Sequence, residues 1–381
     1  MDAGLAGAEH RLEIRFVGSG SEYFRIWIVN LLLTLVTIGL YYPFAKARRL
    51  RYFHAATEVG THALSFHGNP WKMFRGFLLV GALVAVYSLA GQVSPVAGLV
   101  AFLIVAALWP ALWHASLRFR LANTGWRGLR ARFTGSRGGA YTALLPALAL
   151  AVAVIGIGVL FGPEADGAKQ PPSPALALLP LVMLIALPAI GWSIKRYQHA
   201  HYALAGEQSR FGVRLTQAYG LALRSFGVSS LVGLLFGVLV ALAFGLFRAL
   251  AADEPRGGAP LLGMAAALLG YLVAVAVVGA YFVARMQNLV WNGTRSEQLR
   301  FESQLRFRAL ALLNLRNWLL VLVTLGLYYP FAKVATVRLR LQALTLFSGV
   351  DPDTLLAAPG AAAGDAAGDA AADLLGIDIG L

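Results

Sequence analysis

The best candidates for metal ligands in this sequence are histidines in polar connections, namely His54, His62, His67, His199 and His201. Only His199 and His201 are close neighbours, and a His-x-His pair suits a metal ion. Neither has a carboxylate or a thiolate nearby to complete a ligand set, so we expect the pair to lie on the solvated face of a strand. The sequence therefore predicts no metal and no cofactor.

Catalytic motifs are missing from the sequence as well. The chain has no cysteine, which excludes thiolate metal sites, iron–sulfur clusters and cysteine nucleophiles. It has no phosphate-binding Walker loop, no Gly-x-Ser-x-Gly nucleophile turn and no His-Glu-x-x-His pair. We predict no catalytic residue, and an enzyme that acts on lipids ranks last among the functions considered.

A thirteen-residue segment occurs near both ends of the chain, at residues 34–46 and 321–333, and its two copies are identical at eleven positions. The candidate functional residues of the copies are Asn30, Thr37, Gly39, Tyr41, Tyr42, Pro43 and Lys46, and Asn317, Thr324, Gly326, Tyr328, Tyr329, Pro330 and Lys333. The glycine and the proline of each copy weaken any helix through them, and threonine and tyrosine hydroxyls can satisfy the backbone groups that a break leaves free. We therefore predict that each copy enters the membrane and returns to the same side as a broken helix. The alternative is an aromatic anchor at the membrane interface with a helix stop.

The chain is too apolar to be solvated by water alone, so lipid must surround part of it. Hydrophobic residues make up 58% of the 381 residues and charged residues 13%, with a mean hydropathy of +0.67. A bilayer core about 30 Å thick needs about 20 apolar residues as a helix. The segments that qualify are 74–92, 96–116, 140–161, 175–194, 226–247 and 261–284, with 24–44 and 309–331 as the two broken ones. We predict an α-helical polytopic membrane protein with six full transmembrane helices and two broken or re-entrant segments; eight full spans is the alternative.

The connections between these spans resemble one another. Arg51, Arg118 and Arg196 each lie six residues before Thr57, Thr124 and Tyr202, and these lie nine residues before Phe66, Phe133 and Phe211. A fourth copy runs from Arg285 to Phe301. Apolar and charged residues alternate before each phenylalanine, which is typical of a half-buried strand, and turn residues precede them. We predict short β-hairpins that gather into a small basic sheet; positively charged loops without strands are the alternative.

Basic residues predict the orientation. The formal charge is +14, and Lys and Arg concentrate in the repeated connections. The positive-inside rule then places these connections and both termini in the cytoplasm of a bacterium, with the spans in its inner membrane. Because the basic residues lie at the membrane boundaries, we predict that the partners are the lipid bilayer and its anionic headgroups. We predict no nucleic-acid partner. The membrane domain is expected to cover residues 1–347, and residues 348–381 are expected to be a disordered Ala/Gly/Asp tail.

The repeated segment also resembles a known family. Residues 37–46 and 324–333 both match the stretch Thr-x-Gly-x-Tyr-x-Pro-[Phe/Trp]-Ala-Lys, which is typical of the YjgN family of bacterial inner-membrane proteins, a domain of unknown function (DUF898). The resemblance covers about residues 11 to 347 and implies a multi-pass inner-membrane protein. Because the family has no established activity, the resemblance assigns no catalytic residue.

Two functions remain open from the sequence. The related end segments favour permease-like transport of a small or anionic solute around a site formed by broken helices. The absence of Asp and Glu from the predicted spans speaks against coupled transport, because coupling needs a group that changes charge inside the membrane. The alternative is a membrane scaffold or assembly factor whose basic β-rich face binds anionic lipid, a protein partner or a second copy of the chain.

Overall fold

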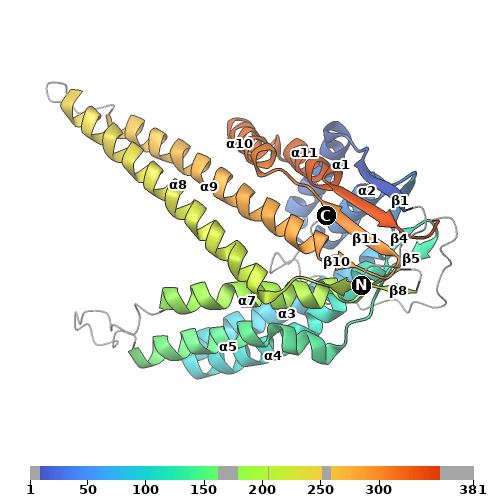
Figure 1. Cartoon of the computed structure of the whole chain (residues 1–381). Helices are drawn as coiled ribbons and strands as arrows, with labels where there is room; N and C mark the ends of the chain where they lie inside the picture. The colour runs from blue at the N-terminus through green and yellow to red at the C-terminus, as the bar shows by residue number, and fades with distance from the viewer. Residues whose placement is uncertain (1–8, 162–178, 205, 251–258, 352–381) are drawn as a thin grey trace.

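The structure, a computed structural model, describes residues 9–161, 179–204, 206–250 and 259–351. Helices extend from one side of a set of short strands (Figure 1). The helices long and apolar enough to cross a membrane are α3 (Pro70–Val93), α4 (Pro95–Ala122), α5 (Arg137–Phe161), α7 (Leu179–His199), α8 (Leu215–Leu250) and α9 (Ala259–Asn292). At most 28% of any apolar window in them is buried, so lipid must cover the rest. The predicted helical polytopic fold is confirmed.

The two broken segments form helical hairpins instead of full spans. They are α1 (Gly20–Val36) with α2 (Tyr42–Ala55), and α10 (Phe307–Val323) with α11 (Tyr329–Gln342). The strand before α1 pairs with the strand after α2, since Phe16 lies opposite Thr57. The strands around the second hairpin pair in the same way, with Ser303 opposite Leu344. Each hairpin therefore leaves the sheet and returns to it, as a re-entrant segment does.

Twelve short strands carry the connections. They are β1 (His10–Phe16), β2 (Thr57–Val59), β3 (His62–Phe66), β4 (Thr124–Trp126), β5 (Leu129–Arg130), β6 (Arg132–Phe133), β7 (Tyr202–Leu204), β8 (Glu207–Gln208), β9 (Arg210–Phe211), β10 (Thr294–Arg295), β11 (Leu299–Ser303) and β12 (Leu344–Ser348). A nine-stranded sheet has the order β5-β4-β3-β2-β1-β12-β11-β10-β9, and a three-stranded sheet has the order β6-β7-β8. Every pairing is antiparallel.

The two sheets join into one closed ring of strands. Only Ala131 separates the edge strand β5 from β6, and only Ser209 separates β8 from the edge strand β9. The amide of Ala131 still donates to the carbonyl of Thr124 at 3.0 Å, and the amide of Ser209 donates to that of Tyr202 at 2.7 Å. Two bent strands thus pass from one sheet to the other. Among the described strands no edge stays open, which removes the template that a free edge offers for aggregation.

Side chains fill the inside of this ring. Trp126 of β4, Leu204 of β7 and Leu346 of β12 come from well-separated strands but pack in one apolar cluster with Phe16 and Phe53. Burying such a side chain contributes about 1.5–3 kcal/mol each. The alternation predicted for the second connection is present, because Leu129 and Phe133 are buried and Arg130 is exposed.

The predicted β-hairpins are present between consecutive helix pairs. The β4–β5 turn has positive φ at Arg127 (53°) and Gly128 (80°), the combination that matches the twist of a two-residue hairpin. In the fourth connection Asn292 ends α9, and the chain turns after Arg295.

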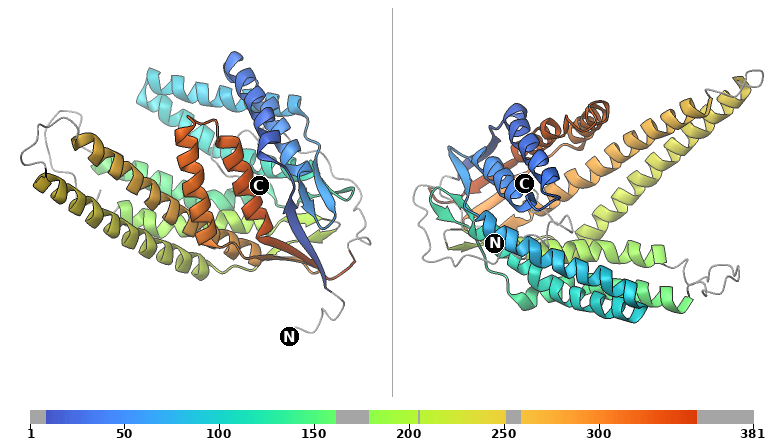
Figure 2. Two further views of the ribbon diagram at one scale, coloured as in Figure 1. Left: turned by 90° about the horizontal axis from the view of Figure 1, so that it is seen from above. Right: turned by 180° about the vertical axis from the view of Figure 1, so that it is seen from behind.

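The helices also follow one another around a ring. Each helix packs against the next one along the chain, and α11 packs against α1. Figure 2 shows the first hairpin beside the last one, while α8 and α9 diverge as a long pair from α3, α4, α5 and α7.

Some predicted segments differ from these elements or extend past the described residues. Ser348, expected to open the disordered tail, is instead the last residue of β12. Residues 352–381 of that tail and residues 175–178 of one predicted span lie outside the described residues.

Candidate functional site

The turn of the first hairpin is built by Thr37 and Gly39. Thr37 Oγ1 donates to the carbonyl of Leu33 at 2.7 Å and accepts from the amide of Tyr41 at 2.9 Å. Gly39 has a φ of 87°, a conformation that costs other residues about 1–2 kcal/mol. The threonine hydroxyl thus satisfies backbone groups at the break, as the sequence predicted.

The second hairpin repeats this geometry with its own residues. Thr324 Oγ1 donates to the carbonyl of Leu320 at 2.6 Å and accepts from the amide of Tyr328 at 2.9 Å. Gly326 has a φ of 93°. In each copy the proline lies in the first turn of the second helix, where its missing N–H costs no hydrogen bond.

An asparagine ties the two helices of each hairpin together. Asn30 Nδ2 donates to the carbonyl of Ala45 at 3.4 Å, and Asn317 Nδ2 donates to that of Ala332 at 3.3 Å. Both asparagines are buried. These bonds give the predicted asparagines a structural role that requires no ligand.

The remaining motif residues are tyrosines, prolines and lysines, and they differ in their contacts and burial. Tyr41 stacks on Phe44 and Tyr328 stacks on Phe331, while Tyr42 and Tyr329 lie against rings of neighbouring helices. Pro43, Pro330 and Lys46 are buried, and Lys333 is half-buried.

The tips of both hairpins expose apolar side chains. Ile38 is 93% exposed and Leu325 is 92% exposed. With 17 residues in α1 and in α10, each tip lies about 25 Å from the start of its helix. Side chains of this kind at that distance are expected to enter the apolar part of the bilayer.

The phenylalanines of the repeated connections belong to the core. Phe66 and Phe133 are buried, Phe211 and Phe301 are half-buried, and all four end or occupy strands. Thr124, the first residue of β4, donates to the carbonyl of Arg120 at 2.9 Å.

One side-chain bond to a backbone carbonyl recurs between neighbouring helix pairs. Arg51 donates to the carbonyl of Gly68 at 3.1 Å, ahead of the next helix pair. Asn288 takes this place in the fourth connection and donates to the carbonyl of Leu305 at 3.0 Å, while Arg285 lies about one turn earlier on α9. Arg118 is half-buried and Arg196 is exposed.

A tyrosine bond recurs within helix pairs, and sequence reasoning missed it. Tyr52 donates to the carbonyl of Ser19 at 2.8 Å, and Tyr197 donates to that of Ser136 at 2.7 Å. Each tyrosine directly follows an arginine of the repeat, and each serine lies three residues after a strand-ending phenylalanine. That shared spacing was the available signal.

The histidine pair does not lie on a solvated strand face, so that expectation is wrong. His199 is buried at the end of α7 and its Nδ1 lies 3.0 Å from Thr294 Oγ1. The half-buried His201 lies with its Nδ1 2.8 Å from the carbonyl oxygen of Tyr197. The described residues hold no cluster of three metal-ligating side chains. His54 is buried as well, and this burial lowers the pKa of its imidazole, helped by the nearby Arg120.

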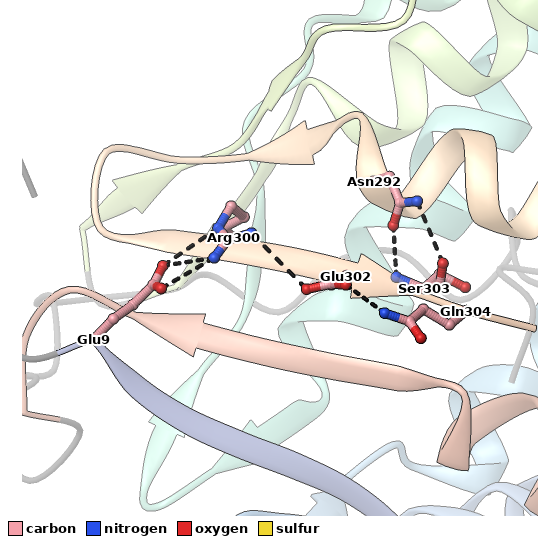
Figure 3. Close-up of polar contacts among 6 residues, drawn as sticks. All are labelled: Glu9, Asn292, Arg300, Glu302, Ser303 and Gln304. Carbon is pink, nitrogen blue, oxygen red and sulfur yellow. Dashed lines mark hydrogen bonds and ion pairs between the residues drawn. The ribbon is translucent and has the colours of Figure 1, made fainter. Parts of the chain in front are cut away.

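Glutamates neutralise much of the positive charge on the strands. Arg300 of β11 binds both carboxylate oxygens of Glu9, at 2.9 and 3.0 Å, and lies 4.0 Å from Glu302 (Figure 3). Arg210 of β9 pairs with Glu297 at 2.7 Å. The predicted sheet exists, but these exposed pairs make it less basic than its arginines suggest.

Exposed arginines instead surround the helix ends nearest the strands. We use the name cationic belt for Arg75, Arg137, Arg196, Arg224, Arg285 and Arg308, from α3, α5, α7, α8, α9 and α10. Within the described residues none of the six forms an ion pair with a carboxylate. The described helices contain a single carboxylate, Glu22 at the start of α1.

Known proteins are similar to this chain over part or most of its length. The chain is 24% identical over 344 residues to "Inner membrane protein YjgN" of Salmonella typhimurium (strain LT2), covering 85% of this chain and 86% of the relative. It is 32% identical over 149 residues to proteins of the same name from Escherichia coli O157:H7 and Escherichia coli (strain K12), which covers 38% of this chain and 36% of each relative. No solved structure matches. The family described as "Bacterial protein of unknown function (DUF898)" matches residues 11–374, so the chain belongs to this family of bacterial membrane proteins.

Proposed function

We propose that the protein is an inner-membrane scaffold that gathers anionic phospholipids around its cationic belt. The observation that carries this proposal is the contrast between two sets of arginines. Among the described residues, the strand arginines Arg210 and Arg300 are matched by glutamates and Arg130, Arg132 and Arg295 are not, whereas none of the six belt arginines has a carboxylate partner. Cations at the ends of apolar helices attract anionic headgroups by about 1 kcal/mol each.

The location and orientation belong to the same proposal. The relatives are named inner membrane proteins, and the connections that carry Lys and Arg are those that form the strands. By the positive-inside rule the ring of strands, the belt and both termini are cytoplasmic.

The repeated bonds favour a chain built from five copies of one unit. Each unit has a strand, two helices and a strand, and the five helix pairs are α1–α2, α3–α4, α5–α7, α8–α9 and α10–α11. The strands on either side of each pair are hydrogen-bonded to each other. The bonds of Tyr52 and Tyr197 occupy equivalent places in the first and third units. Five similar units around one axis suit a scaffold, because they present one surface repeatedly to the surrounding lipid.

A second candidate is permease-like transport of a small or anionic solute. It is favoured by the contact between the two hairpins, where Phe24 lies 5.8 Å from Phe331 and Trp27 lies 6.2 Å from Tyr329 between ring centres. Two features speak against it: apolar side chains fill the ring of strands, and the described membrane-crossing helices carry no carboxylate for coupling.

Lipid composition distinguishes these functions. After mild detergent extraction, the purified protein is expected to retain phosphatidylglycerol and cardiolipin above their share of the membrane. The triple variant Arg75→Gln, Arg137→Gln and Arg308→Gln should lose much of this enrichment, whereas the control Arg15→Gln with Arg210→Gln should keep it.

Other results would contradict the proposal. Equal enrichment in both variants, or none in the wild type, overturns lipid gathering. Uptake of a small anion by proteoliposomes above the protein-free level would support the permease, and stoichiometric capture of a protein partner or a second copy without lipid enrichment would support an assembly factor.

A further inference from the structure

A groove between α8 and α9 opens at the level of the cationic belt. Its volume is about 490 Å³, and the residues that line it include Thr216, Gln217, Gly220, Arg224, Tyr281 and Arg285. On α8 the positions 217, 220 and 224 share one face, and on α9 the positions 281 and 285 share another. Two helix faces therefore form the walls, and each contributes one arginine.

The groove combines cations with neutral donors. The Arg285 guanidinium lies 5.5 Å from the centre of the Tyr281 ring, a cation–π contact that restricts where the guanidinium can move. Gln217 Oε1 accepts from the backbone amide of Arg214 at 2.8 Å, which leaves the amide hydrogens of Gln217 as donors. No carboxylate is among the described residues that line the groove. A phosphate oxygen is the ligand that two guanidinium groups and an amide suit best.

The depth of the groove in the membrane indicates that the phosphate belongs to a phospholipid. Residues 225–247, directly after Arg224, and residues 259–284, directly before Arg285, contain no charged residue. Each stretch exceeds the roughly 20 residues needed to cross the bilayer core. Both arginines thus stand at the boundary of the apolar region, where phospholipid phosphates lie. Leu221 and Leu289 add apolar surface to the same groove.

We propose that this groove is a specific binding site for the phosphate of one anionic phospholipid, with its acyl chains beside Leu221 and Leu289. The site rests on the proposed function, since two of the belt arginines, Arg224 and Arg285, line the groove. It goes further by naming the two helices, the phosphate contacts and a stoichiometry of one lipid per chain.

The test uses the full chain in nanodiscs of phosphatidylcholine with a small fraction of phosphatidylglycerol, and native mass spectrometry after release into detergent. One phosphatidylglycerol should stay bound to the wild type. Arg224→Gln with Arg285→Gln should weaken its apparent affinity by about thirtyfold, because each lost cation is expected to weaken it by about fivefold. Arg214→Gln, which removes a cation near the groove but outside its lining, is the matched control and should bind as the wild type does.

A second variant fills the groove with an apolar side chain and leaves both arginines in place. A Cβ added at Gly220 meets nothing within 4 Å, so Gly220→Leu should fold and fill the groove. It should displace the tightly bound lipid, while Gly227→Leu, also open but outside the lining, should not.

The outcomes separate the site from the function. Unchanged retention in both Arg224→Gln with Arg285→Gln and Gly220→Leu overturns the site, while general enrichment of anionic lipid in those same variants leaves the scaffold proposal standing. Displacement of the bound lipid by millimolar inorganic phosphate would mean that the groove takes free phosphate, and this also overturns a lipid site. No preference for phosphatidylglycerol over phosphatidylcholine in the wild type contradicts both proposals.

Discussion

Arg338 of α11 donates a hydrogen bond from Nη2 to the backbone carbonyl oxygen of Gly18, 320 residues earlier in the chain, at 2.7 Å. Arg51 makes the corresponding bond from the first helix pair to Gly68, which precedes the second. Both arginines lie five residues after the lysine of the twin motif. The bond that links the first helix pair to the second therefore also links the last helix pair to the first.

Removing the Arg338 bond is expected to destabilise the closure of the ring. Arg338→Gln should lower the free energy of unfolding by about 1–2 kcal/mol, because a charged donor is lost from a backbone carbonyl. Thermal unfolding in detergent, followed by size-exclusion fluorescence, measures this change. Arg15→Gln is the control, since the exposed Arg15–Glu13 pair contributes less than about 1 kcal/mol. Equal shifts in both variants would argue against a closing role for Arg338.

The hairpin turns should tolerate only glycine at two positions. Gly39→Ala and Gly326→Ala place a side chain where φ is 87° and 93°, which costs about 1–2 kcal/mol. Gly81→Ala in α3 is the matched control, because its added Cβ meets nothing within 4 Å and alanine favours the helix. Thermal stability of the three variants checks this. A hairpin that accepts alanine without loss would mean that its turn differs from the one described.

Acid should weaken the protein partly through His54. Burial holds the pKa of His54 below 6.5 in the folded state, so the unfolded chain binds the proton first as the pH falls. The stability that the neutral imidazole contributes is complete above about pH 6.5 and is lost as the pH drops below it. His54→Leu, which copies Leu121 at the same place in the second unit, should flatten this dependence. His62→Gln, at an exposed position, should not change it.

The core of the strands should be sensitive to charge on one face only. Phe133 is 8% exposed and packs against Trp113 and Tyr197, so Phe133→Asp should cost at least about 3 kcal/mol and reduce the folded yield. Arg132→Asp, one residue away and half-buried, should change the yield little. A similar loss from both would indicate that the connection is not a strand.

Orientation can be tested cleanly because the chain has no cysteine. Ser94→Cys, between α3 and α4, should react with a membrane-impermeant maleimide in cells with a permeable outer membrane. Arg127→Cys, in the β4–β5 turn, should react only after lysis. A fluorescent protein fused at residue 350 should mature, and alkaline phosphatase at that position should stay inactive. The reverse pattern would place the strands in the periplasm.

Sequence patterns predict those features whose causes are local. The spacing of Gly39 and Pro43 breaks a helix wherever it occurs, and the alternation of Leu129 and Phe133 with arginines indicates a strand face. Apolar length identifies eight segments, and the glycine and proline in two of them separate the six spans from the hairpins. These predictions depend on residues that lie within a few positions of each other, so tertiary contacts had little to change.

The features that sequence reasoning missed depend on distant contacts. Glu9 neutralises Arg300 across 291 positions, and His199 is buried by Thr294 from a strand 95 positions away. The closure of the ring depends on Ala131 and Ser209, which join strands of two residues each; an alternating pattern indicates a strand there, but it does not show that the two halves of the strand pair in different sheets. Local periodicity cannot report any of these three.

The pairing of β1 with β12 has a consequence for biosynthesis. As the chain leaves the ribosome, its first strand has no permanent neighbour on one side until the last strand is made, so the earlier helix pairs enter the membrane as an open arc. In a circular permutation that joins residue 381 to residue 1 and starts the chain at His62, the first residue of β3, every strand pair can still form, but β2 and β3 become the pair that forms last. Such a permuted chain is expected to reach the same closed structure, with a different unit added last.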